Sequence, residues 1–226
     1  MDLIRSDWRR YPKNIAKAGT DTTLEGSQNV SNNDFEVGSV NIEENALNQP
    51  PYVLPPGIDR QVLSGNAGAQ RQNEASLYVK AKSLPANEAR GVFKNVQLDM
   101  RRYKKLRLFV HAQDPNNNDV NLGQIDQKTK FFIRFGSDAT DNYYEYEASL
   151  KLTPRTATTP LEIWPFENEV NMDIQDFVDA KIRRDKNSPN NIIQRIQDTE
   201  FDAGSTFRKL YIKGRPSLGN VTTIMV

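Results

Sequence analysis

Apolar and polar residues alternate along several stretches of the chain, and this alternation is the strongest pattern in the sequence. The stretches cover residues 76–82, 91–100, 106–112, 131–135 and 143–152. Successive side chains of a β-strand point to opposite faces, so a period of two predicts strands with one dry face and one wet face. Turn residues separate the stretches. The pattern therefore predicts an all-β fold, an antiparallel β-sandwich with one short helix.

The alternation also assigns individual side chains to the two faces of the predicted sheet. In the longest stretch, Tyr144 and Tyr146 fall on the face that we expect in the core. Charged side chains occupy the opposite strand faces, and we expect them in water. They are Lys80, Lys82, Arg107, Arg134, Glu145, Glu147 and Lys151. The strand pattern resembles the jelly-roll of carbohydrate-binding and galactose-binding modules, as an analogy of fold alone.

Two weaker patterns predict further strands. Residues 35–42 read as a strand with a β-bulge at residues 38–39, because the apolar residues change face there. Residues 208–213 and 221–226 are expected to pair as a hairpin across the glycine- and proline-containing turn between them.

A single helix is predicted shortly after residue 170. Asn171 or Asp173 can cap it, and its acidic residues come early and its basic residues late, as the helix dipole favours. Its apolar side chains recur at helical spacing, so we expect them to face the core. They are Ile174, Phe177, Val178 and Ile182.

Prolines and polar residues divide the chain into three parts. Residues 1–50 are expected to contribute strands and a polar loop to the sandwich. In residues 51–75, prolines exclude a helix or a central strand, which predicts a stiff extended segment followed by an exposed loop at 59–75. Residues 76–226 are expected to form the main sandwich.

The composition narrows the function mainly by exclusion. Thirty Lys and Arg against 29 Asp and Glu leave a formal charge of +1, which favours neither nucleic acid nor an anionic membrane. The chain has no cysteine, so disulfides, zinc–thiolate sites and cysteine nucleophiles are excluded. No stretch approaches the roughly 20 apolar residues of a membrane helix. We therefore expect no nucleic-acid partner and no membrane insertion of these residues.

Both ends of the sequence have the pattern of a strand that is expected to continue beyond the given residues. Residues 3–8 resemble the tail of a strand, and residues 221–226 are a β-branched run that stops within its pattern. No secretory signal peptide is visible near Met1. We therefore expect a segment of a longer exported protein, whose targeting signal lies upstream.

One polar loop has the residue types of a calcium site. Asp114, Asn116, Asn118 and Asp119 carry the oxygen ligands that hard cations prefer. The glycine and the closing glutamate of an EF-hand are missing, so a turn of Asn and Asp residues without metal is the alternative. No cofactor is predicted.

No group of residues predicts a catalytic site. The one histidine, His111, lies in the third predicted strand beside Arg107 and Phe109 on the non-core face, and we expect a structural or surface role for it. Glu145 and Glu147 share a strand face, and paired carboxylates can hydrolyse glycosidic bonds. A solvated strand face is the simpler explanation of this pair, and a glycosidase is the alternative.

Aromatic residues predict a second alternative, a platform on which sugar rings stack. The set comprises Trp8, Tyr52, Tyr143, Tyr144, Tyr146 and Trp164. Tyr144 and Tyr146 fall on the predicted core face, so core packing is favoured for those two. A carbohydrate-binding module with a glycan partner is therefore kept as the alternative function.

Ten short motifs follow one another along nearly the whole chain. They are Asp7–Tyr11, Val40–Asn45, Tyr52–Arg60, Asn73–Leu77, Asp99–Leu106, Phe109–Ala112, Phe132–Asp138, Asp141–Glu147, Asn171–Ile174 and Ile212–Gly219. In this order they resemble the SprA/Sov family, cell-surface proteins of gliding and secreting Bacteroidota. Each motif is weak alone, but ten in one order are specific.

The resemblance implies a function in protein secretion. The family's full-length protein is a very large transmembrane β-barrel, the outer-membrane pore of the type IX secretion system. Its partners include secreted cargo proteins, a PorV-like small barrel and a periplasmic plug, and the family has no catalytic residues.

The charged strand faces of this chain differ from a barrel wall, which alternates with a lipid-facing apolar side. By resemblance we therefore expect a non-enzymatic domain inserted in that translocon, in the cell outer membrane as part of the full-length protein, on its extracellular or periplasmic side. It is expected to shape or cap the pore and to contact cargo or partner subunits in secretion and gliding motility.

Overall fold

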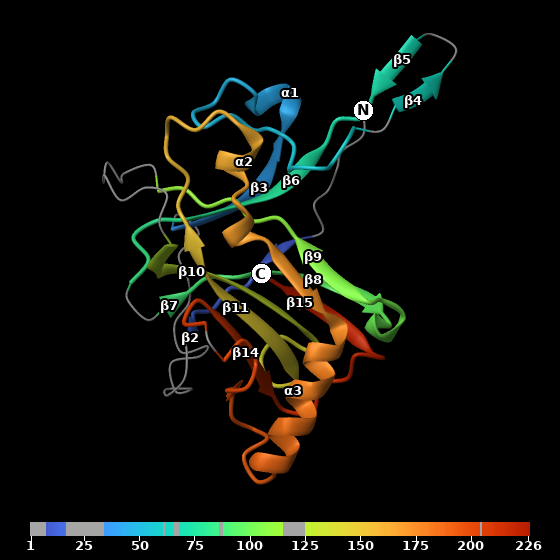
Figure 1. Ribbon diagram of the computed structural model, residues 1–226, viewed down its shortest axis with the longest axis vertical. Coiled ribbons are helices and arrows are strands. Elements are labelled where there is room, and N and C mark those ends of the chain that lie inside the picture. The colour runs from blue at the N-terminus through green and yellow to red at the C-terminus, as the bar shows by residue number, and fades with distance from the viewer. Residues whose placement is uncertain are drawn as a thin grey trace.

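A seven-stranded antiparallel sheet forms the centre of the computed structural model of this protein (Figure 1). The structure describes residues 8–16, 34–60, 62–65, 68–85, 88–114, 125–203 and 205–226. From edge to edge, the sheet consists of β1 (Arg9–Arg10), β8 (Val92–Leu98), β15 (Val221–Met225), β10 (Ile125–Gly136), β11 (Tyr143–Lys151), β14 (Arg208–Lys213) and β13 (Ile196–Asp198).

The remaining described strands form antiparallel pairs. These are β2 (Ile15–Ala16) with β7 (Glu88–Ala89), β3 (Phe35–Asn41) with β6 (Ala75–Ala81), β4 (Val62–Gly65) with β5 (Gly68–Arg71), and β9 (Lys105–Leu108) with β12 (Val170–Asp173). The β4–β5 hairpin stands away from the central sheet (Figure 1). The structure is mostly β, as predicted, but one large sheet with small pairs does not establish a jelly-roll sandwich.

Three α-helices and two 3₁₀-helices are described in place of the single predicted helix. They are α1 (Ile42–Asn45), α2 (Pro160–Ile163), α3 (Ile174–Asn187), η2 (Met100–Arg102) and η3 (Phe166–Asn168). The predicted helix is α3, and Asp173 caps it in a capping box with Asp176.

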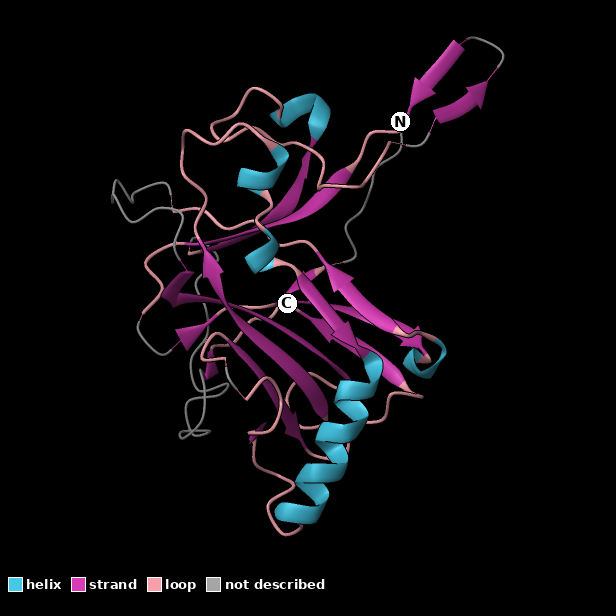
Figure 2. Ribbon diagram, in the orientation of Figure 1, coloured by secondary structure: helices cyan, strands magenta, loops and turns pink. Residues whose placement is uncertain are grey.

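Helix α3 and the β9–β12 pair cover one face of the central sheet (Figure 2). Phe177 of α3 is fully buried, and its ring lies 4.8 Å from that of Phe135 and 5.9 Å from that of Tyr144. Tyr144 and Tyr146 are buried in this core, as predicted. Burial of Tyr144 raises the pKa of its hydroxyl to about 12, although the positive charge of Arg184 opposes the shift.

On β10 and β11, charged residues of the opposite face are also buried, which contradicts the prediction that they lie in water. Arg134, Glu145 and Glu147 are 2%, 2% and 6% exposed. They are buried because they pair with each other and with a loop that covers them, and paired charges tolerate burial. Lys82 and Arg107 are exposed, as predicted.

The predicted hairpin of residues 208–213 and 221–226 is wrong. These residues form β14 and β15, but β10 and β11 lie between the two strands in the sheet. Sequence neighbours need not pair when the connection between them is long enough to pass other strands.

Two further local predictions are wrong. The β3–β6 register runs from Phe35 opposite Ala81 to Asn41 opposite Ala75 without a shift, so the strand has no bulge at residues 38–39. The predicted exposed loop at 59–75 contains the β4–β5 hairpin, in which Val62 lies opposite Arg71 and Gly65 opposite Gly68. Segments so close in sequence readily pair as a hairpin.

The proline-rich segment after residue 50 is neither helix nor strand, as predicted. Its turn closes with a hydrogen bond of 3.1 Å from the Ile58 N–H to the Pro55 carbonyl. Pro56 and Gly57 occupy the central positions, and the φ of Gly57 is +78°, as a type II turn requires. Trp164 Nε1 donates to the Val53 carbonyl at 2.8 Å and anchors the segment to the rest of the protein.

Candidate functional site

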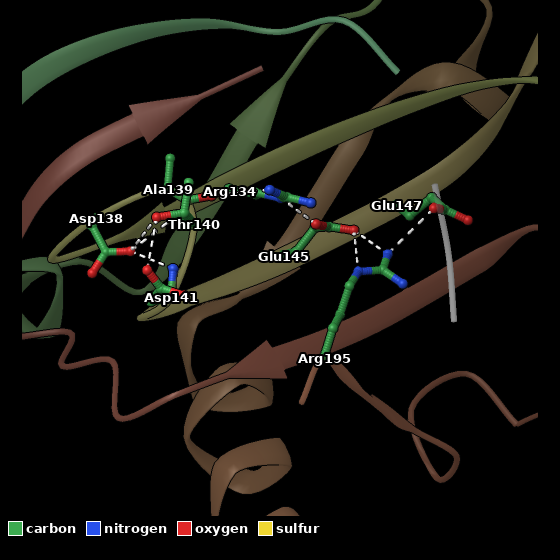
Figure 3. Close-up of polar contacts among 8 residues, drawn as sticks. All are labelled: Arg134, Asp138, Ala139, Thr140, Asp141, Glu145, Glu147 and Arg195. Carbon is green, nitrogen blue, oxygen red and sulfur yellow. Dashed lines mark hydrogen bonds and ion pairs between the residues drawn. The ribbon is translucent and has the colours of Figure 1, made fainter. Parts of the chain in front are cut away.

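A buried carboxylate lies between two arginines on the central sheet (Figure 3). Glu145 on β11 lies directly opposite Arg134 on β10, whose Nε donates to Glu145 Oε2. From the loop before β13, Arg195 donates to Glu145 Oε1 through Nη2 and, at 3.1 Å, through Nε. The carboxylate therefore ties two strands and a loop together.

Glu147 extends this buried network along β11. Its Oε2 lies 3.4 Å from Arg195 Nη2, and its Oε1 accepts from Lys130 Nζ at 2.8 Å. The Arg195 guanidinium also stacks on the ring of Tyr211, with its carbon 3.2 Å from the ring centroid. Stacking and ion pairing together hold the Arg195 loop against the sheet.

Opposing effects determine the protonation of this network. Burial disfavours the charged form of Glu145, but the two guanidiniums outweigh it and hold the pKa of the carboxyl below its ordinary value. Burial likewise disfavours the charge of Arg195, and the Glu145 carboxylate reverses this effect and raises the pKa of Arg195. Both groups are therefore charged at neutral pH.

The turn between β10 and β11 begins at Asp138, next to this network (Figure 3). The Asp138 carboxylate accepts the backbone N–H groups of Thr140, Asp141 and Asn142 at 3.0, 2.5 and 2.9 Å. Burial disfavours its ionisation, but the Asn142 side-chain amide and these backbone donors keep the pKa of Asp138 below its ordinary value. Arg134 Nη1 also donates to the Ala139 carbonyl at 2.9 Å, which joins the turn to the network.

A pocket of about 350 Å³ lies where this turn meets the end of β14 and the Arg195 loop. Its lining consists of Asp141, Asn142, Ile192, Ile193, Gly214 and Arg215. Two hydrogen bonds join the walls: Arg215 N–H to Asn142 Oδ1 at 2.9 Å, and Gly214 N–H to the Ile192 carbonyl at 2.6 Å. These bonds connect the β10–β11 turn, the end of β14 and the loop that carries Ile192.

Gly214 is required at the centre of this junction. Its φ is +67°, and a Cβ there would overlap the Asp141 carbonyl oxygen. We expect Gly214→Ala to lower the free energy of unfolding by about 2 kcal/mol, because a left-handed residue with a Cβ is strained and the turn must also move. Urea denaturation measures this loss.

The matched control is Gly57→Ala. Gly57 has a similar φ of +78° with nothing within 4 Å of its Cβ position, so this substitution should cost only about 1 kcal/mol. Equal losses for the two variants would show that the junction at Gly214 is not tightly packed.

A family model described as "Motility related/secretion protein", SprA_N, matches residues 1–226. The chain belongs to the SprA_N family. This confirms the family resemblance that its sequence motifs carry. No curated protein matches the sequence.

The SprA_N family is described by motility and secretion, and that description names no reaction. The geometry of Glu145 bears on the glycosidase alternative. A glycosidase needs one carboxyl with a raised pKa that can donate a proton. Glu145 has a lowered pKa and both its oxygens accept from arginines, so it does not fit that role.

The aromatic residues singled out in this SprA_N chain are mostly packed inside it. Tyr143, Tyr144, Tyr146 and Trp164 are between 0% and 7% exposed. Tyr52 and Trp164 do meet, edge to face at 6.2 Å. The contact fixes the proline-rich segment and leaves Trp164 buried, so this set does not form an open face for stacking sugars.

His111 has a structural environment, which is one of the two roles expected from the sequence. Its Nδ1 lies 2.9 Å from the Ile163 carbonyl and 3.2 Å from Thr153 Oγ1, and its ring meets that of Trp164 at 5.8 Å. These contacts connect the end of β9 with the segment around α2.

The predicted calcium ligands fall largely outside the described residues. Asn116, Asn118 and Asp119 lie there, and Asp114 is exposed at the end of a described segment. Within the described ranges, no group of three or more His, Cys, Asp or Glu residues could hold a metal. The calcium site stays a prediction.

Sequence reasoning missed Arg195 and Asp138. Arg195 is a single basic residue in a polar loop, 50 positions from Glu145, and nothing local marks it as buried. Asp138 does carry a signal, because an Asp that starts a short polar turn commonly accepts the following backbone N–H groups.

Among the helices of the described residues, none has the length and the apolar composition that a membrane span requires.

Proposed function

We propose that this chain is a non-enzymatic domain of the outer-membrane translocon of type IX secretion. In that role it shapes or caps the pore and contacts cargo or partner subunits, including a PorV-like small barrel and a periplasmic plug. The observation that carries the proposal is the match of the SprA_N family over all 226 residues. Membership of a motility and secretion family supports a part in the export machinery itself.

The structure supports a rigid, adhesive element better than a catalytic one. Strand β11 is buried on both faces, and the charged residues on one of these faces pair with residues of β10 and of the loop before β13. Large apolar side chains are exposed elsewhere, such as Leu161 and Phe166 at 71% and 75%. Exposed apolar side chains on a stiff frame suit contact with another protein.

Deletion of residues 8–226 from the full-length protein tests the requirement for this domain. We expect loss of type IX cargo from the culture medium and loss of gliding, with the rest of the protein still present in the outer membrane by immunoblot. Normal secretion by the deletion strain would contradict the proposal.

A photo-crosslinking residue at Phe166 tests the same proposal without removing any structure. Phe166 is exposed, so its replacement leaves the core intact. Light-dependent adducts with secreted cargo, the small barrel or the plug are expected, with non-irradiated cells as the control. Adducts confined to proteins outside the secretion system would count against the proposal.

A further inference from the structure

An exposed basic turn, residues 99–105, connects β8 to β9 at the margin of the molecule (Figure 2). The turn contains the 3₁₀-helix η2, and it carries four cations, one carboxylate and one tyrosine. The cations are Arg101, Arg102, Lys104 and Lys105, the carboxylate is Asp99, and Tyr103 lies among them. Because the formal charge of the whole chain is only +1, the basic turn concentrates positive charge that the rest of the chain balances.

The backbone of the basic turn is held in place at both ends. Met100 is 7% exposed, and its N–H donates to the Leu218 carbonyl at 2.7 Å. The Lys104 carbonyl accepts the N–H of Ile174, the first residue of α3, at 2.9 Å. The side chains of the turn therefore project from a fixed backbone, and less conformational entropy is lost when they bind a partner.

Arg101 is the cation of the turn that a carboxylate holds closely. Its Nε and Nη2 donate to the two oxygens of Asp99, both at 2.9 Å. Arg102 lies 3.8 Å from the same carboxylate, and Lys105 lies 3.7 Å from Asp173. Water screens exposed pairs at such distances, so these two cations keep most of their charge for another partner.

The charged side chains of the turn stand out into solvent. Those of Arg102 and Lys105 are 82% and 59% exposed, and Tyr103 is 56% exposed. Lys104 is exposed as well, and within the described ranges its ammonium makes no hydrogen bond or ion pair. Such exposure belongs to a convex part of the surface, which cannot enclose an acidic peptide but can lie against a flat anionic surface.

We infer that the basic turn binds the phosphate groups of lipid headgroups at the surface of the outer membrane. Arginine and lysine pair with phosphate oxygens through charge-assisted hydrogen bonds. A tyrosine suits the boundary between headgroups and acyl chains, because its ring is apolar and its hydroxyl is polar. A lipid surface therefore matches both the charge of the turn and the ring of Tyr103, whereas an acidic peptide matches the charge alone.

This inference rests on the proposed function, which holds the domain at the outer membrane. A turn with a few cations binds an anionic surface only weakly by itself. A domain that is tethered to a membrane protein needs no more than weak affinity, because the tether keeps the local concentration of headgroups high. The contact orients the domain against the membrane and requires no inserted segment.

Flotation of the 226-residue chain with lipid vesicles tests the inference. Vesicles of phosphatidylcholine and phosphatidylglycerol in equal amounts are compared with vesicles of phosphatidylcholine alone. The chain should bind the anionic vesicles about tenfold more tightly than the neutral ones. High salt should release it, because the Debye length falls from about 10 Å at 0.1 M to about 3 Å at 1 M.

Two matched double variants locate the contact. Arg102→Gln with Lys104→Gln should weaken binding to the anionic vesicles about tenfold or more, since each basic residue near such a surface adds to the affinity. Arg155→Gln with Lys186→Gln removes the same charge from exposed residues outside the turn and should leave binding unchanged. Equal losses in the two double variants, or equal binding of the intact chain to anionic and neutral vesicles, would overturn the inference.

Tyr103→Ser distinguishes a lipid surface from an acidic protein. It should weaken binding to the anionic vesicles about threefold or more, because the ring no longer contacts the headgroup layer. Soluble polyglutamate is the competing ligand. Binding of polyglutamate that depends on Arg102 and Lys104, together with unchanged vesicle binding by Tyr103→Ser, would replace the lipid by an acidic protein.

Two outcomes separate this inference from the proposed function. Crosslinks from Phe166 to the small barrel, together with a chain that binds no vesicles, would remove the lipid contact and leave the proposed function standing. Vesicle binding that depends on the basic turn, together with normal secretion by the deletion strain, would leave the lipid contact standing and contradict the proposed function.

Discussion

Glu145→Gln is expected to lower the free energy of unfolding by about 3–5 kcal/mol, because it leaves buried guanidiniums without their counter-charge. Arg134 and Arg195 both donate to the Glu145 carboxylate, and the arginine and glutamate side chains are 8% exposed or less. An amide oxygen can accept one of these bonds but does not neutralise the charges. Urea denaturation of the wild type and the variant measures the difference.

The matched control is Glu167→Gln. Glu167 accepts from Lys151 Nζ at 2.8 Å, but its side chain is 23% exposed and that of Lys151 is 26% exposed. Water screens a pair of this kind, so we expect a loss of about 1 kcal/mol or less. Similar losses for the two glutamates would mean that the network is hydrated and does not hold the sheet.

A double variant tests the coupling within the network directly. Arg195→Met together with Glu145→Gln should cost less than the sum of the two single substitutions, since each single variant leaves a buried charge that the double variant partly removes. Strict additivity would show that Arg195 and Glu145 stabilise the protein independently of each other.

The sequence could predict the strands of the central sheet because their alternation is local. The stretch 143–152 became β11, and the stretch 131–135 became the end of β10. The alternation could not predict whether the polar face of these strands is exposed to water or covered by another part of the protein. Charged residues at every second position look the same whether water or a loop with Arg195 covers them, and that loop lies 50 residues away in the chain.

Strand order and the candidate site depend on the same kind of distant contact. Residues 208–213 and 221–226 are adjacent in sequence, yet they occupy separate positions in the sheet because β10 and β11 pair between them. The pocket likewise joins Asp141, Ile193 and Arg215 from three connections. No local sequence pattern in one of these segments predicts its contact with the others. They come together only when the sheet has assembled.

The prediction of helix α3 contains a smaller error, which also arises from contacts between residues distant in sequence. Its N-terminal cap was predictable because the capping box is local in sequence. Its buried face was assigned partly wrongly, because Ile182 is 61% exposed while Ala180 and Arg184 are buried. With 3.6 residues per turn, Ile182 lies on the far side of the helix from those two residues. The packing of Phe177 against the sheet sets the rotation of α3 about its own axis. The hydrophobic pattern of the helix alone does not determine this rotation.

Phe177→Ala should therefore lower the free energy of unfolding by about 3–5 kcal/mol, since Phe177 is fully buried where α3 meets the sheet. The substitution removes the ring that contacts Phe135 and Tyr144 and leaves a cavity between helix and sheet. Ile182→Ala on the same helix is the control and should change stability by about 0.5 kcal/mol or less. A large loss at Ile182 with a small one at Phe177 would show that α3 packs on the sheet through its other face. The expected contrast would place the anchor of the helix at Phe177, on the opposite side of the sheet from the network of Glu145 that carries the candidate site.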